Sequence, residues 1–168
     1  MRLIPLETVH QILAIFGITS PTGEYTRWAK EDGFEADDLY TVVHESPFVI
    51  GIDWRGVLPD TLEYVVPALR ELGAKLEVEM SNEADEGWVS CNGSRAYLKF
   101  VPSDEDDFTD VIRAMQEIVP ETIEFRAYAF NDGACGWDFA VLLREEWEEL
   151  ERLEPKWVEE TFKYLWDV

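Results

Sequence analysis

The sequence predicts an α+β fold, a single domain over residues 1–168 in which a mainly antiparallel sheet of about six strands packs with helices. Some segments place apolar residues at helical spacing, whereas others have an apolar residue at every second position. Short turn signals join several of the alternating segments, as is typical of antiparallel strands. No linker, internal repeat or low-complexity segment divides the chain, and 168 residues can bury about two-thirds of their unfolded surface.

The first third of the chain is expected to begin with helices and then to form a strand. Residues 6–16 have helical spacing, and Gly17 ends that pattern. Residues 24–30 are expected to form a short helix, and the acidic residues 31–45 a loop with another short helix. Phe48–Trp54 alternates and is the first expected strand. The residues on one face of this strand are Phe48, Ile50, Ile52 and Trp54.

A helix and a half-exposed strand are expected next. Asp60 followed three residues later by Glu63 is the signature of a capping box, so a helix should begin there and end at Gly73. Pro67 should kink it, because the proline ring clashes with the carbonyl one turn back. Leu76–Met80 alternates apolar residues with charged ones and predicts a strand with one face in water.

The dipeptide Asn92-Gly93 predicts a tight hairpin between residues 87–91 and 94–101, since Asn-Gly between alternating runs favours a two-residue turn. Pairing across this turn sets Trp88 opposite Tyr97 and Ser90 opposite Arg95. The residues expected to point to the core are Val89, Ala96, Leu98 and Phe100.

A helix is expected between residues 103 and 120. Ser103 should cap it, and the acidic first turn Asp104–Asp107 suits the positive end of the helix dipole. The apolar stripe along it consists of Phe108, Val111, Ile112, Met115, Ile118 and Val119.

The stretch Thr122–Arg144 organises the predicted fold. Two runs of aromatic and branched residues flank the Gly-rich turn Asn131–Gly136, which predicts an antiparallel hairpin. If Phe130 pairs with Trp137, Phe139 and Val141 share a face with Tyr128, and Phe125 and Ala127 lie on the other. Neither face is polar, so the hairpin is expected to be central and covered on both sides, or covered on one side and used for binding on the other.

Two helices are expected after this hairpin. Residues 145–154 should form a short helix with Trp147 and Leu150 inward. Pro155 should open a last helix. The apolar side of this helix would comprise Val158, Phe162 and Leu165, extended by Trp157 and Trp166.

Acidity is the strongest global feature. The chain has 36 Asp and Glu residues against 14 Lys and Arg, a formal net charge of −22. Such a chain is repelled by nucleic acid and by anionic membranes, and it attracts a basic protein. The alternative is that the acidity serves only solubility. No apolar run is long enough for a membrane helix and no signal peptide is recognisable, so a cytoplasmic location with reduced thiols is expected.

The sequence contains no recognisable catalytic or metal-binding motif, so neither catalytic residues nor a cofactor or metal is expected. His10 and His44 lack metal-ligand spacing, Cys91 and Cys135 form no CxxC, and no GxSxG or phosphate-binding loop is present. Carboxylate pairs such as Asp53 with Asp138, or Glu77 with Glu79, could bind Mg²⁺ or transfer protons. With 36 carboxylates, however, such pairs arise by chance.

Asp138 needs a partner, because it lies in a mostly apolar predicted strand and an unpaired buried carboxylate is costly. Two arginines of the same hairpin could pair with it. The expected partner of Asp138 is therefore Arg126 or Arg144.

Two acidic patches beside the aromatic pair Trp88 and Tyr97 form the candidate binding site. The residues of the first patch are Glu83, Asp85 and Glu86, and those of the second are Asp104, Glu105, Asp106, Asp107 and Asp110. If the patches have only a structural role, the first is a turn exposed to water and the second places acidic residues at the positive end of a helix dipole. As a site, the patches would surround an aromatic anchor with an acidic rim, which is typical of tight, electrostatically steered interfaces.

In size, acidity, tryptophan content and lack of catalytic motifs, the chain resembles the immunity proteins that bacteria pair with secreted or contact-delivered toxins. The resemblance is one of general character and rests on composition, without a family motif. It implies a non-enzymatic protein that neutralises a basic toxin, commonly a nuclease, by direct binding. Two other interpretations are a small enzyme or ligand-binding domain with a carboxylate-lined pocket, and an adaptor subunit.

Overall fold

The computed structural model describes residues 2–19, 33–53, 56–81, 86–99, 105–130 and 136–168, with the backbone alone for residues 105–108. The helices are α1 Leu6–Ile15, α3 Ala36–Val43, α4 Leu58–Glu71, α5 Glu105–Ile118, α6 Arg144–Leu153 and α7 Pro155–Thr161. The strands are β1 Leu3–Ile4, β2 Phe34–Glu35, β3 Val49–Asp53, β4 Leu76–Met80, β5 Glu86–Cys91, β6 Ser94–Lys99, β7 Ile123–Tyr128, β8 Gly136–Leu143 and β9 Phe162–Tyr164. The predicted α+β class is confirmed.

The strands form three antiparallel sheets. The largest has the order β3-β8-β7-β9, the second has the order β4-β5-β6, and β1 pairs with β2. The six expected strands are all present, but they are divided between the two larger sheets, and β1, β2 and β9 are additional.

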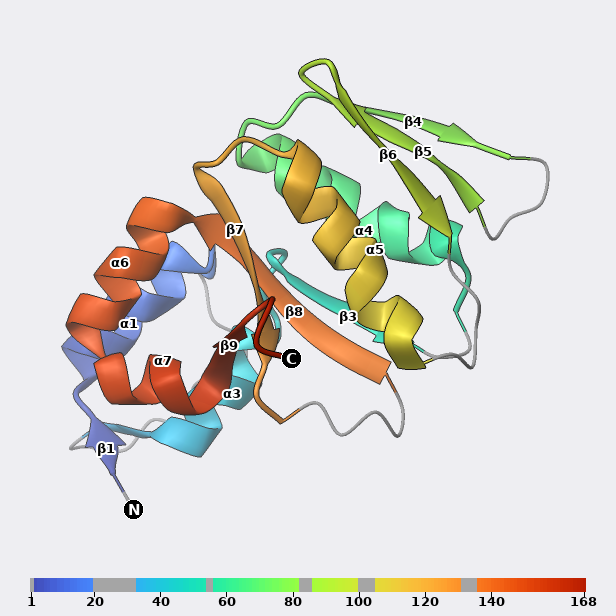
Figure 1. The fold of residues 1–168 in the computed structure, drawn as a ribbon. Helices are drawn as coiled ribbons and strands as arrows, with labels where there is room; N and C mark the ends of the chain where they lie inside the picture. The colour runs from blue at the N-terminus through green and yellow to red at the C-terminus, as the bar shows by residue number, and fades with distance from the viewer. Residues whose placement is uncertain (1, 20–32, 54–55, 82–85, 100–104, 131–135) are drawn as a thin grey trace.

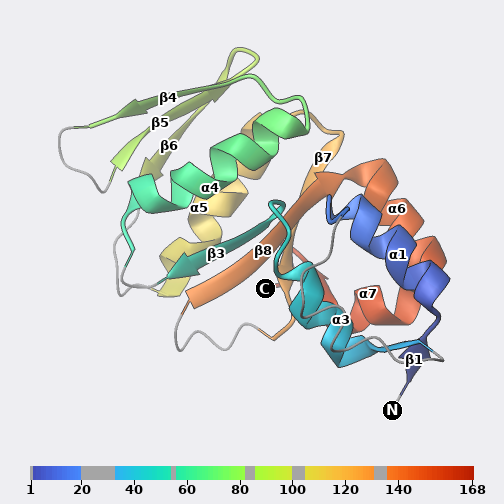
Figure 2. The same cartoon turned by 180° about the vertical axis from the view of Figure 1, so that it is seen from behind.

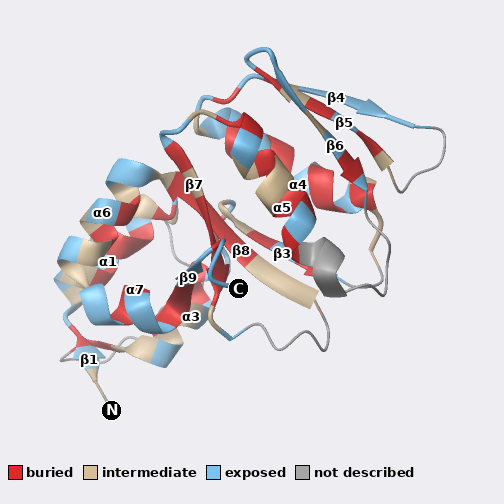
Figure 3. Ribbon diagram, in the orientation of Figure 1, coloured by how far each residue is buried: buried red, intermediate tan, exposed pale blue. Residues whose placement is uncertain are grey.

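The four-stranded sheet lies in the middle of the molecule with a hydrophobic core on each face (Figures 1, 2 and 3). Helices α4 and α5 fill the space between this sheet and the three-stranded sheet, whereas α1, α3, α6 and α7 cover the opposite face. The first core includes Ile50, Ile52, Val65, Leu69, Val89, Leu98, Ile112, Phe125 and Phe139. The second includes Ile12, Phe16, Phe34, Leu39, Tyr128, Leu142, Trp147, Trp157 and Phe162. The expected central hairpin, covered on both faces, is therefore confirmed.

The register of that hairpin differs from the expectation by one residue. Phe125 pairs with Val141 and Ala127 with Phe139, whereas pairing Phe130 with Trp137 would set Ala127 opposite Ala140. Because side chains alternate between faces, this shift places Phe139 and Val141 in the same core as Phe125. The connection of residues 129–135 is long, so it does not fix the register as a two-residue turn does.

The second hairpin has the predicted register. Trp88 pairs with Tyr97 and Ser90 with Arg95. The turn residues Asn92 and Gly93 have φ of 50° and 88°, the positive values that a two-residue hairpin turn of type I′ requires.

Helix α4 begins at Leu58, two residues before the expected cap. Asp60 is therefore the third residue of the helix, where its carboxylate accepts a hydrogen bond from the backbone N–H of Val57 at 3.4 Å. The helix continues through Pro67 to Glu71.

The last expected helix is shorter than predicted. It ends at Thr161, and the chain then forms β9, which pairs with β7. The free edge of β7 offers Phe162–Tyr164 a set of backbone hydrogen-bond partners, and this long-range pairing overrides the helical spacing of Phe162 and Leu165. Strand β4 is more exposed than expected, since only Leu76 is buried. The expected short helix 24–30 and the roles of Trp54, Phe100 and Ser103 lie outside the described residues, as does the side chain of Phe108.

Candidate functional site

The predicted aromatic pair lies on the outer face of the three-stranded sheet. Trp88 and Tyr97 are opposite each other on β5 and β6, with ring centroids 5.0 Å apart. The side chains are 39% and 45% exposed, although both are large and largely apolar. The inner face of the same strands buries Val89 and Leu98 against the helices, so the alternation of the strands determines which rings reach the surface.

Charged groups hold the two rings in place. Arg95 forms an ion pair with Glu79 at 2.6 Å, and its guanidinium carbon lies 4.3 Å from the centroid of the Trp88 ring. The Tyr97 hydroxyl donates a hydrogen bond to the Glu86 carboxylate. Glu86, Trp88 and Tyr97 are among the site residues that the sequence predicts. Glu79 and Arg95 are not, because only the β4–β5–β6 register brings them beside Trp88.

The remaining predicted site residues are not brought to this face by any described contact. Glu83, Asp85 and Asp104 lie outside the described residues, and Glu105, Asp106 and Asp107 form the first turn of α5, where the backbone alone is described. Asp110 is exposed on the same helix and forms an i,i+3 ion pair with Arg113 at 3.5 Å. Helix α5 packs below the opposite, inner face of the sheet. The second acidic patch therefore stays a prediction.

A second cluster of polar groups joins α3 to the central sheet. The Nε2 atom of His44 lies 2.9 Å from Oδ2 of Asp138, and both side chains are partly exposed. This corrects the expectation that Asp138 pairs with Arg126 or Arg144. Gly51 lies opposite Asp138 on β3, and a Cβ atom there would be 3.0 Å from Oδ1 of Asp138. A glycine at this position leaves room for the carboxylate.

Two tyrosines complete this cluster. The Tyr40 ring lies 5.7 Å from the His44 ring and 5.1 Å from the Tyr128 ring. The Tyr128 hydroxyl is buried and has no hydrogen-bond partner within the described part of the chain. The sequence indicates that Asp138 needs a partner, but it does not identify His44, because the two residues are 94 positions apart.

The environment shifts the acidity of three of these groups. Hydrogen bonding to Asp138 raises the pKa of His44 above its ordinary value of 6.5, although burial acts in the opposite direction. Burial raises the pKa of Tyr128 well above 10.0, and the nearby Tyr40 and Asp138 add to the rise. Burial and the Asp138 charge also raise the pKa of Tyr40. The hydrogen bond to Asp138 therefore favours the protonated form of His44.

A cavity of about 310 Å³ adjoins this cluster and is lined by Gly51, Ile52, Asp53, Gly136, Trp137 and Asp138. The structure thus brings together Asp53 and Asp138, the carboxylates that the sequence suggested as one possible acid pair. The volume of this cavity lies at the lower end of the range for small-molecule sites. Across the described residues, no group of three His, Cys, Asp or Glu side chains is arranged to hold a metal ion.

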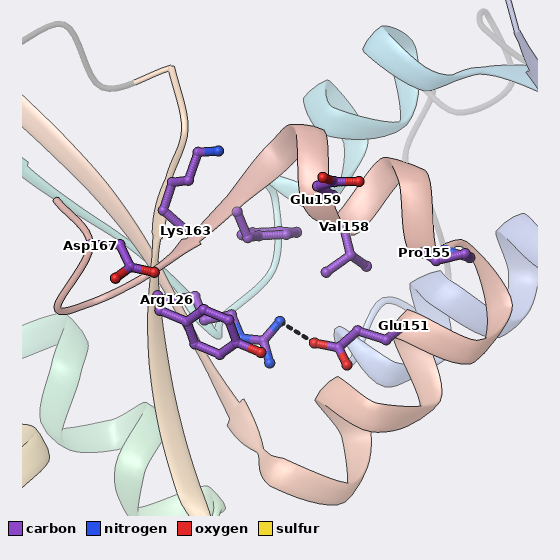
Figure 4. Close-up of a pocket in the computed structure, with 9 residues that line it drawn as sticks. Arg126, Glu151, Pro155, Val158, Glu159, Lys163 and Asp167 are labelled. Atoms are coloured by element: carbon purple, nitrogen blue, oxygen red, sulfur yellow. Dashed lines mark hydrogen bonds and ion pairs between the residues drawn. The ribbon is translucent and has the colours of Figure 1, made fainter.

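Arg126 lines a larger cavity of about 420 Å³ between α6, α7 and β9 (Figure 4). Its guanidinium forms ion pairs with Glu124 at 2.8 Å and with Glu151 at 2.7 Å. It also lies 4.3 Å from the Trp147 ring centroid and 4.5 Å from that of Tyr164. Two carboxylates already neutralise this buried cation, so Arg126 joins the layers of the molecule and does not form an anion site.

No helix in the described ranges is long and apolar enough to cross a membrane. Cys91 is buried with a free thiol, and Cys135 lies outside the described residues. Comparisons with protein-family models, curated proteins and solved structures found no match to this chain.

Proposed function

We propose that the protein is a non-enzymatic binder that holds a basic protein partner against the outer face of the three-stranded sheet. The single observation that carries this proposal is the pair Trp88 and Tyr97, two large rings that pack on each other and yet stay exposed. Tryptophan and tyrosine are the side chains that most often dominate binding energy at protein interfaces. The described residues place no element over them.

The contacts around the rings support an interface that is ordered before the partner arrives. Arg95 bridges Trp88 and Glu79, and Glu86 accepts the hydrogen bond from Tyr97. Side chains already held in one geometry lose less conformational entropy on binding. Trp88 and Tyr97 are therefore suited to act as anchors.

Charge supports a basic partner. With a net charge of −22, the molecule produces a field that draws a cationic protein toward it before contact. Within this proposal the partner is a toxin, for example a nuclease, which the protein neutralises in the cytoplasm as bacterial immunity proteins do.

The test starts with a pull-down from the native host, followed by mass spectrometry of the retained proteins. The recovered partner is then measured against wild type and Trp88→Ala, which should dissociate at least tenfold faster because a buried interface anchor is lost. Tyr64→Ala is the matched control, since Tyr64 is 63% exposed on α4 and lies outside the outer sheet face. A partner released equally slowly by wild type and Trp88→Ala would contradict the proposed interface.

A ligand-binding domain is the second candidate, and the observation that favours it is the His44–Asp138 pair beside the cavity of about 310 Å³. Trp137 lines this cavity, so its fluorescence would report a bound small molecule. A compound that changes the fluorescence of wild type but not of Asp138→Asn would support this candidate over the binder.

A further inference from the structure

The three-stranded sheet has an open edge at β4. This strand pairs with β5 alone, and no described element runs along its other side (Figures 1 and 2). Residues 77–80 are all exposed. An open edge of this kind exposes backbone donors and acceptors that can pair with another strand.

The hydrogen-bond pattern identifies which backbone groups point outward. The N–H of Ser81 donates to the carbonyl of Glu86 at 3.0 Å, so Ser81 and Glu86 form a hydrogen-bonded pair. Because such pairs alternate along an antiparallel ladder, Glu77 and Glu79 also bond to β5, and the N–H and C=O groups of Val78 and Met80 point away from it.

An independent contact agrees with this alternation of inward-pointing and outward-pointing backbone groups. Leu76 has the same orientation as Val78, and its carbonyl accepts a hydrogen bond at 3.2 Å from Arg70, which lies outside the sheet. The two-residue turn at Asn92-Gly93 requires the same alternation, since it makes Cys91 and Ser94 a hydrogen-bonded pair.

The side chains of β4 define the strand that would fit. Val78 and Met80 lie on the inner side of the sheet and are 37% and 36% exposed. Glu77 and Glu79 lie on the outer side, beside Ser90 and Trp88 of β5. An added strand would complement this edge if its residues alternate between apolar side chains, which cover Val78 and Met80, and basic side chains opposite the glutamates.

A second copy of the chain does not fit the same edge. Two β4 strands paired antiparallel about Val78 would set Glu77 of each copy opposite Glu79 of the other. Like charges directly opposite destabilise a strand pair, and the two molecules each carry a net charge of −22. The other edge of the sheet, β6, carries Arg95 and Lys99 and would repel a basic strand.

We propose that β4 accepts a strand of alternating basic and apolar residues, which extends the β4-β5-β6 sheet to four strands. This inference rests on the proposed function in that the strand belongs to the basic partner. It adds the mode of recognition: backbone hydrogen bonds at Val78 and Met80 supply affinity, and the glutamates supply selectivity.

The probe is a fluorescein-labelled, end-capped synthetic peptide of residues 74–81 that carries Glu77→Lys and Glu79→Lys. Its binding to the full protein is measured by fluorescence anisotropy at low ionic strength. The unsubstituted peptide should bind at least tenfold more weakly, because its glutamates would face those of β4. In the antiparallel register centred on Val78, the peptide N–H at position 78 faces the β4 edge and the N–H at position 79 faces away. N-methylation at position 78 should therefore weaken binding at least tenfold more than N-methylation at position 79.

On the protein, Val78→Pro should weaken peptide binding at least tenfold, because it removes an outward N–H without removing a bond to β5. Tyr64→Ala, at an exposed position on α4, is the control and should change the affinity less than threefold. The inference would be overturned if the peptide does not bind detectably, or if Val78→Pro binds it as tightly as wild type does. Equal effects of the two N-methyl groups would also overturn it. The methylated peptides do not depend on the folding of Val78→Pro. Binding lost in Trp88→Ala but kept in Val78→Pro would overturn edge pairing while supporting the proposed aromatic face.

Discussion

At the scale of single residues, the contact between His44 and Asp138 connects α3 to the central sheet. A carboxylate in an apolar strand predicted a partner, and the structure provides one, but it is His44 and not Arg126 or Arg144. The two arginines were expected because they are close in sequence. The packing of α3 against the sheet, which the sequence does not specify locally, brings His44 to Asp138 instead.

The raised pKa of His44 predicts a pH-dependent contribution to stability. Because the folded-state pKa lies above the unfolded one of about 6.5, the contribution is complete below pH ~6.5 and is lost as pH rises through the folded-state value. His44→Gln should therefore lower the free energy of unfolding more at pH 5.5 than at pH 8.5. The difference should be at most ~1 kcal/mol, since the pair is partly exposed and screened by solvent.

Urea titrations at the two pH values measure this difference. His10→Gln, at an exposed position on α1, is the control. An equal loss of stability at both pH values would show that the His44–Asp138 contact does not depend on the charge of His44.

The Tyr128 hydroxyl leads to a second prediction at this scale. It is buried and has no partner among the described residues, so it costs desolvation energy without gaining a hydrogen bond. Tyr128→Phe should leave the free energy of unfolding unchanged or raise it by up to ~1 kcal/mol. Chemical denaturation measures this, with the half-buried Tyr40→Phe for comparison. A loss of more than ~1 kcal/mol would instead reveal a hydrogen bond that Tyr128 makes in solution.

At the scale of elements, the sequence predicted best where the signal is local. Helix α1 follows from apolar spacing, and the β5–β6 register follows from the Asn92-Gly93 turn. The β7–β8 register and the switch from α7 to β9 could not be obtained in this way. Both depend on contacts between distant segments, which decide which face of a strand is buried and which edge is free.

The turn of the β5–β6 hairpin provides the prediction at this scale. Gly93 has a φ of 88°, and a Cβ atom there would meet nothing within 4 Å, so Gly93→Ala adds backbone strain without a steric clash. It should lower the free energy of unfolding by about 1–2 kcal/mol. Ser94→Ala, at the next exposed position, should change it by less than about 0.5 kcal/mol. Equal stabilities of the two variants by urea denaturation would show that the turn tolerates an L side chain.

At the scale of the whole molecule, composition predicted the character of the surface but not its arrangement. The sequence predicts an acidic rim around Trp88 and Tyr97, and most of the residues of that rim lie outside the described side chains. The described part of the outer face mixes Glu77, Glu79 and Glu86 with Arg95 and Lys99. Pairing across three strands sets this mixture, and composition contains no information on pairing. Under the proposed function, the acidity would act on the partner through the total field, while the rings and the β4 edge would act on contact.

The distinction between the long-range field and direct contact predicts how charge changes affect the binding of the basic partner recovered from the host. Glu77→Lys, on the proposed β4 interface, should slow association severalfold at low salt, because steering acts before contact, and should also speed dissociation, because Glu77 faces the basic strand. Glu145→Lys, exposed on α6 across the central sheet, changes the net charge equally. It should slow association less, because its electrostatic field at the proposed interface is weakened by distance and by screening. The screening length is about 10 Å at 0.1 M salt. Stopped-flow measurements from roughly 20 to 200 mM salt should show the association rates of the two variants converging as screening increases. Association rates that are equal for wild type and both variants at low salt would show that the acidity serves solubility and not recognition.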